Sequence, residues 1–108
     1  MVPRSVRRNR RLDALRQPLQ AERKADVLNR LKTARGHIDH VITLLEGEAY
    51  VLDVLRQIAA VRGALDATVR TALRHYFENT FVNAVEAGQS EPAIDELMSA
   101  LTFLRQID

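Results

Sequence analysis

The stretch VLDVLRQIAAVRGALDATVRTALRHYFENTFVNAV, residues 51–85, decides the fold. Its stripe-forming residues recur at steps of three and four, the period of one helix face. They are Val51, Val54, Leu55, Ile58, Val61, Leu65, Val69, Ala72, Leu73, Tyr76, Phe77, Thr80, Phe81 and Ala84. We predict one helix over residues 48–85, about 55 Å long. A 108-residue globule is too small to cover such a helix, so we expect part of the stripe to pack on a second chain.

Two further helices flank this one. Apolar residues at helical spacing predict a helix over 19–46, which Gly47 ends, and another over 91–106, which follows the stop at Gly88. Ser90 is the expected N-cap of the last helix. Gly36 interrupts the first helix, which suggests close packing against a neighbouring helix. The fold class is therefore all-α, with three helices per protomer, and two protomers pair most economically as a four-helix bundle.

The composition excludes several kinds of chemistry. The chain has no cysteine, so it has no disulfide, thiolate metal site, cysteine nucleophile or thiol switch. It shows neither a secretory signal nor an apolar run of the ~20 residues that span a membrane. We expect a cytoplasmic protein with no membrane partner.

Charge is distributed unevenly along the chain. Residues 1–32 contain ten basic and three acidic residues, a net charge of +7, whereas residues 33–108 carry −5. We expect residues 1–18 to form a flexible basic arm and residues 19–108 to form the helical domain. The basic part favours nucleic acid over a membrane surface, because it lacks the aromatic amphipathic pattern of membrane-bound helices. A solvated tail that binds nothing specific is the alternative.

No enzyme motif is present. The sequence contains no Gly-rich phosphate loop, nucleophile elbow or zincin signature. His37 and His40 lack a third metal ligand in view, and a solvated or core-edge pair is the simpler reading. A hard-metal site using His75 and Glu78 is conceivable. We expect no catalytic residue and no resident metal or cofactor.

The segment from Asn29 to Asp66 resembles the CsoR/RcnR family of bacterial metal-sensing repressors, and its copper-sensing branch above all. The shared elements are RLK-x-x-RGH-x-D, LE-x-x-AY and DVL-x-QIAAVR, and the likeness extends over about residues 25–104. The resemblance implies an antiparallel four-helix dimer and a disc-shaped tetramer of two dimers. It also implies a homo-oligomeric repressor that holds double-stranded operator DNA on a broad basic face until a ligand releases it.

The resemblance also indicates the DNA-binding residues. Arg30 and Lys32 match basic positions of the family, and Arg35 lies close to them. The family often has a further basic residue at the position of Ala67, for which Arg70 and Arg74 are the candidate substitutes. The arm adds Arg7, Arg8, Arg10 and Arg11, together with Arg4.

The family's copper(I) ligands are replaced. Its two cysteines and one histidine correspond here to Val51, Thr80 and Tyr76, and none of the replacements is a good ligand for this soft ion. Tyr76 and Thr80 keep an i, i+4 spacing, so we expect an altered effector pocket formed by Val51, Tyr76, Thr80 and His75. Tyr50 and Glu96 match positions that couple the family's metal site to its third helix; a helix corner and a surface carboxylate are the plainer alternatives.

Three functions follow from this reading. The first is a DNA-binding repressor that responds to an effector other than copper(I), including a hard metal held by His75. The second is a repressor that responds to no ligand. The third is a helical partner that forms mixed oligomers with a true copper sensor, which the loss of a basic residue at Ala67 favours.

Overall fold

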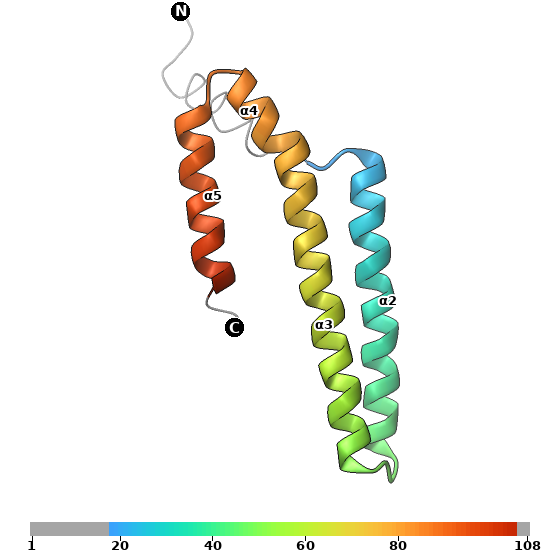
Figure 1. Ribbon diagram of the computed structural model, residues 1–108. Helices are drawn as coiled ribbons and strands as arrows, with labels where there is room; N and C mark the ends of the chain where they lie inside the picture. The colour runs from blue at the N-terminus through green and yellow to red at the C-terminus, as the bar shows by residue number, and fades with distance from the viewer. Residues whose placement is uncertain (1–17, 106–108) are drawn as a thin grey trace, which may run out of the picture. The chain divides into compact units, whose positions relative to one another are not determined.

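The computed structural model describes residues 18–105, and its regular structure there is entirely helical (Figure 1). Helix α2 spans Ala21–Glu46 and α3 spans Val51–His75. The chain continues through a π-helical segment, η1, over Tyr76–Phe81 and a short helix α4 over Val82–Glu86, and the described part ends in α5 over Ser90–Arg105. Three helical stretches in an all-α fold confirm the predicted class.

The contacts divide the chain into two compact units. One unit is Gln20–Arg74, and the other contains residues 75–105 of the described chain. In the first unit, α2 and α3 form an antiparallel hairpin (Figure 1). Its core is a valine cluster of Val41, Val54 and Val61, each at most 8% exposed, against which Leu44 and Ala49 pack. Val54 and Val61 of the predicted apolar stripe thus face α2, whereas Leu55 and Ile58 of the same stripe are exposed.

The connection between α2 and α3 is short and tightly bonded. The Gly47 N–H donates to the carbonyls of Thr43 and Leu44, which ends α2 where the sequence predicts. The Tyr50 carbonyl accepts from the N–H groups of Asp53 and Val54 and so begins α3. The predicted start at residue 48 is therefore three residues too early.

In the second unit, α4 leads into α5 through a turn at Gly88. This glycine has a φ of +78°, the left-handed conformation that commonly ends helices. Ala84 and Ala93 are fully buried and pack with Phe81. The Gln89 carbonyl accepts the Ala93 N–H, so Gln89 caps α5 and Ser90 lies inside its first turn. The assignment of Ser90 as N-cap was wrong by one residue.

Two further expectations are corrected. The helix over 48–85 is not α-helical throughout, because the Val82 N–H donates to the Phe77 carbonyl five residues earlier, the π pattern. Gly36 does not pack closely against a helix of its own chain, since a Cβ there would meet nothing within 4 Å in the described structure. The 16 residues of α5 match the predicted third helix closely.

Candidate functional site

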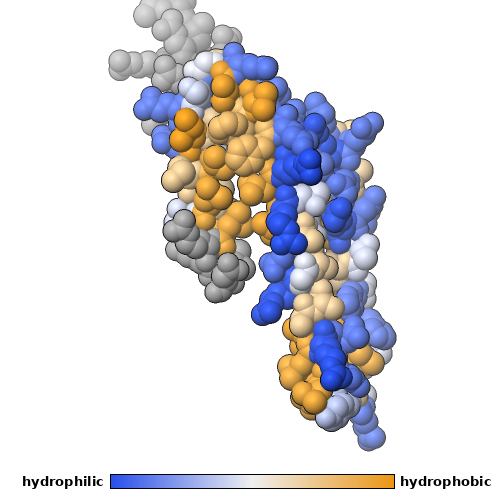
Figure 2. All heavy atoms as spheres, viewed as in Figure 1, coloured by the Kyte–Doolittle hydropathy of each residue, from blue (hydrophilic) through white to orange (hydrophobic). Residues whose placement is uncertain are grey.

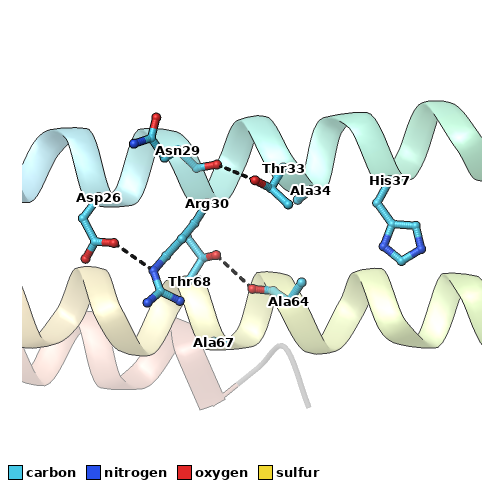
Figure 3. A pocket seen from close by; sticks show the side chains of 9 residues that line it. All are labelled: Asp26, Asn29, Arg30, Thr33, Ala34, His37, Ala64, Ala67 and Thr68. Carbon is cyan, nitrogen blue, oxygen red and sulfur yellow. Dashed lines mark hydrogen bonds and ion pairs between the residues drawn. The ribbon is translucent and has the colours of Figure 1, made fainter.

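The basic residues of the hairpin lie on different sides of α2. Successive residues in an α-helix are about 100° apart, so Lys32 lies nearly opposite Arg30, whereas Arg35 lies on the side of Lys32. Lys32 and Arg35 are exposed. Arg30 instead extends toward α3, as Figure 3 shows. The sequence predicted one basic cluster here, and the helix separates it into two.

Arg30 forms an ion pair on its own helix. Its Nε atom lies 3.1 Å from Oδ1 of Asp26, and the two side chains are 47% and 41% exposed. Exposed pairs of this kind contribute little to stability. Asp26 therefore places a negative charge beside Arg30, a candidate DNA-binding residue. The i, i+4 spacing of the two residues signals this pair, which was not predicted from the sequence.

Arg30 and Ala67 line the same pocket between α2 and α3. Arg70 and Arg74 follow Ala67 at steps of three and four, so they continue along the same side of α3. Both are exposed. The hairpin therefore supports a row of Arg30, Arg70 and Arg74, with Lys32 and Arg35 on another side. The arm residues Arg7, Arg8, Arg10 and Arg11 lie outside the described part of the chain.

Val51 and His75 are the first and last residues of α3. These two members of the predicted pocket therefore lie at opposite ends of a 25-residue helix. Val51 is 65% exposed and belongs to an apolar surface at the loop end of the hairpin, visible in Figure 2, whose exposed residues include Leu45, Tyr50, Leu52 and Leu55.

Tyr76 and Thr80 lie in the π-helical segment η1. Thr80 is 3% exposed, and the side chains of Tyr76 and Phe77 make an edge-to-face contact with ring centroids 6.1 Å apart. The hydroxyl of Tyr76 is buried and finds no hydrogen-bond partner within residues 18–105. The α-helical spacing on which the predicted pair rested does not hold in this segment.

Glu96 acts on Tyr76 electrostatically. Burial first, and the negative charge of Glu96 second, raise the pKa of Tyr76 above its ordinary value of 10.0, because both disfavour the phenolate. The family resemblance pairs Glu96 with Tyr50, and the relationship of Glu96 to Tyr76 was not predicted from the sequence. The side chain of Tyr50 is 63% exposed, and its described bonds are those of its carbonyl at the start of α3.

Asn79 is a buried polar residue that the sequence analysis did not select. It is 8% exposed, and its Oδ1 accepts a hydrogen bond of 3.2 Å from Nδ2 of Asn83. An asparagine pair at i, i+4 within an apolar stripe is the signal that could have found it.

Residues 18–105 contain all three histidines of the chain. Within this range no group of three or more His, Cys, Asp or Glu side chains is placed to hold a metal ion. His37 bonds to Gln57 through Nε2, 2.7 Å from Oε1, as expected of a core-edge histidine. No helix in the described range is long and apolar enough to cross a membrane.

Comparison with known proteins identifies the family. Residues 23–102 match the model of the metal-sensitive transcriptional repressors. The copper-sensing transcriptional repressor CsoR of Mycobacterium ulcerans is 45% identical over 82 residues, which are 76% of this chain and 70% of that protein. Its namesake in Mycobacterium tuberculosis (strain H37Rv) is 44% identical over 85 residues, 79% of this chain and 71% of that protein.

A more distant relative agrees with this assignment. The copper-sensing transcriptional repressor CsoR of Bacillus subtilis is 30% identical over 78 residues, 72% of this chain and 77% of that protein. No solved structure gives a significant match. The matched residues take in α2, α3, η1 and α4 almost completely and most of α5. The chain therefore belongs to the CsoR/RcnR family of metal-sensitive transcriptional repressors, which are regulators and not enzymes.

Proposed function

We propose that this protein represses transcription by binding operator DNA and that copper(I) does not control it. The observation that carries the proposal is a chain without cysteine, in which Val51, Tyr76 and Thr80 stand where the family resemblance implies copper ligands. Copper(I) is selected by soft thiolate ligands, which this chain cannot supply. The relatives named as copper-sensing repressors are therefore models for its DNA binding and not for its ligand.

DNA binding in this proposal uses the basic residues of the hairpin. Arg30, Arg70 and Arg74 form one row, and Lys32 and Arg35, on another side of α2, contact phosphates outside this row. The arm over residues 1–18 adds positive charge beside the domain over 19–108. Each neutralised phosphate releases counterions, so the affinity falls steeply with salt. A regulator of this kind works in the cytoplasm, where the chromosome is.

Oligomerisation completes the effector pocket. Val51 is far along α3 from Tyr76, so the two meet most readily when they come from different protomers. The exposed apolar surface around Val51, with Leu45 at 66% and Leu55 at 53%, supports burial against another copy. We propose an antiparallel four-helix dimer and a tetramer of two dimers.

The pocket suits a neutral polar effector. The Tyr76 hydroxyl is buried without a partner in the described chain, and a ligand that accepts its hydrogen bond would satisfy it. The negative charge of Glu96 disfavours an anionic ligand at this position. Tyr50 and Glu96 would then couple the pocket, with His75 at its edge, to α5. A hard-metal site using His75 gains no support, because no three potential ligands gather within residues 18–105.

Fluorescence anisotropy with the DNA upstream of the protein's own gene tests the proposal. The expected result is binding that unrelated duplex does not displace and that copper(I) does not weaken. Release of the operator by stoichiometric copper(I) would contradict the proposal. Binding that survives every added ligand would instead identify the repressor that responds to none.

A partner role in mixed oligomers is the second candidate. Ala67 favours it, because this position lacks the basic side chain that the family often has there. The variant Ala67→Arg tests this point, with Ala59→Arg as the control that adds the same charge at an exposed position of α3. Weak operator binding by the natural protein, restored by Ala67→Arg alone, would favour the partner role.

A further inference from the structure

A pocket of about 390 Å³ opens between α2 and α3 (Figure 3). Neither Val51 nor any residue of η1 lines it. Its apolar floor consists of Ala34, Ala64 and Ala67, where small side chains leave space between the helices. Small-molecule sites typically measure roughly 300–1,000 Å³, with apolar walls and a few placed polar groups. The pocket is therefore large enough for a small organic ligand.

Arg30 marks one end of this pocket. Figure 3 shows its guanidinium extending from α2 toward α3 beside Asp26. The ion pair with Asp26 uses Nε, at 3.1 Å, and a guanidinium has five N–H donors. The four donors on the two terminal nitrogens have the planar geometry that suits a carboxylate or a phosphate. The terminal nitrogens of Arg30 thus offer donors to an acidic group, while the carboxylate of Asp26 in the same lining opposes its charge.

His37 marks the other end. It follows Arg30 by seven residues, two helical turns or about 10 Å along α2. Its Nε2 lies 2.7 Å from Oε1 of Gln57, and a carbonyl oxygen only accepts, so Nε2 donates. Nδ1 of the neutral ring is then an acceptor. A hydroxyl group on a ligand would supply the matching donor.

We propose that this pocket binds a small hydroxy acid. Its carboxylate or phosphate lies on the terminal nitrogens of Arg30, its apolar middle lies on the three alanines, and its hydroxyl donates to His37. A phosphate of DNA offers the same acidic chemistry at Arg30. The two sources differ because only a small molecule fills the floor between Arg30 and His37.

Occupation of the pocket has a consequence for DNA. Arg30 is also a proposed DNA-binding residue, so a bound acid competes with a DNA phosphate for the same guanidinium. This consequence rests on the proposed function, whereas binding of the acid does not. The acid would weaken DNA binding directly, without any change at Tyr76.

Proton–nitrogen correlation spectra of the full chain test the binding, with para-hydroxybenzoate as the probe. The expected result is saturable shifts at the Nε–H of Arg30 and at the amides of Ala64 and Thr68, with a Kd of about 1 mM or lower. Inorganic phosphate, the acidic group alone, should shift Arg30 more weakly. The neutral para-hydroxybenzyl alcohol should shift none of them.

The variant Ala67→Leu fills the floor, and Ala59→Leu is the matched control at an exposed position of α3 outside the pocket. We expect Ala67→Leu to weaken binding of the probe at least about tenfold and Ala59→Leu to leave it unchanged. Both variants should keep the helical circular dichroism of the parent. The proposal would be overturned if neither para-hydroxybenzoate nor inorganic phosphate gives saturable shifts. It would also be overturned if the two variants bind para-hydroxybenzoate with equal affinity.

A parallel titration with duplex DNA distinguishes the two sources of the acidic group. If DNA shifts the pocket amides and para-hydroxybenzoate does not, the pocket is a contact for DNA phosphate and the small-acid proposal is wrong. If the probe binds but leaves the DNA affinity unchanged, the competition is refuted and the ligand site stands. Displacement of DNA by the probe that is abolished in the Ala67→Leu variant supports both the ligand site and the competition with DNA.

Discussion

Tyr76 on the π-helical segment and Glu96 on α5 are electrostatically coupled. Burial is the larger cause of the raised pKa of Tyr76, and the carboxylate of Glu96 adds to it. The folded chain therefore holds the phenolic proton more tightly than the unfolded chain does. The free energy of unfolding should fall as the pH rises past 10.0, until the phenol ionises in the folded state as well.

The variant Glu96→Gln should lower the pKa of Tyr76 and make that fall in stability smaller. Tyrosinate absorbance during a pH titration measures the pKa. Because the chain has two tyrosines, the titration is made in a Tyr50→Phe background, where Tyr76 alone reports. An unchanged pKa in the Glu96→Gln variant would show that burial alone causes the shift.

Copper(I) should bind the natural protein no more tightly than a nonspecific site. The triple variant Val51→Cys, Tyr76→His and Thr80→Cys restores the ligands that the family uses, and it should gain more than about a hundredfold in copper(I) affinity, since even the residues around a metal ligand contribute up to that factor. Competition against a copper(I) chelator under anaerobic conditions measures the affinity of the natural protein and of the triple variant. A tight complex with one copper per natural protomer would refute the altered pocket.

Asp26 should weaken DNA binding by neutralising Arg30. We expect Asp26→Asn to raise the DNA affinity by up to about fivefold, the range of an exposed ion pair. Asp39→Asn removes the same charge from an exposed position of α2 and serves as the control. In an Arg30→Gln background the gain should vanish. Equal gains from Asp26→Asn and Asp39→Asn would show a general charge effect instead.

The basic arm should set the salt dependence of DNA binding. Deleting residues 1–17 should flatten the plot of log affinity against log salt by about 0.9 for each phosphate that the arm neutralises. Anisotropy titrations at several salt concentrations measure this slope. A slope that the deletion leaves unchanged would remove the arm from the DNA-binding surface.

Two glycines should respond oppositely to alanine. Gly88→Ala places a side chain at a φ of +78° and should cost at least about 1 kcal/mol of unfolding free energy. Gly36→Ala should instead gain about 0.5–1 kcal/mol, because the helix benefits and the space is open. Urea unfolding at a fixed protein concentration compares them. A loss of stability in Gly36→Ala would reveal another copy of the chain packed at that point.

The sequence predicted the fold well where periodicity and helix stops agree. Gly47 and Gly88 end helices in the structure as they were expected to, because their backbone conformations and hydrogen bonds are local. The π-helical segment was not predictable in this way, since apolar steps of three and four describe it no differently from an α-helix. The cap of α5 was misplaced by one residue for a related reason, as Ser90 suits both the cap and the first turn.

The candidate site was predicted less completely than the fold. Counting along the sequence placed Arg30 and Lys32 together, but their two-residue spacing turns them to different sides of α2. The pocket beside Arg30 was invisible because it depends on which residues of α3 lie opposite, and Ala67 was read only as a missing charge. The relation of Tyr76 to Glu96 depends on how α5 folds back after the turn at Gly88, which the sequence does not reveal.

The π-helical segment also indicates where the chain can lose one residue without disrupting its helices. Its hydrogen bonds enclose one residue more than those of an α-helix, as an inserted codon would produce. Loss of one codon within Tyr76–Phe81 would let the segment close into ordinary α-helix. The same loss in α2 before Val41, or in α3 between Val54 and Val61, would rotate every later residue of that helix by about 100° and turn one side of the valine cluster outward. Single-residue deletions should therefore be tolerated in this turn and almost nowhere else in the helices.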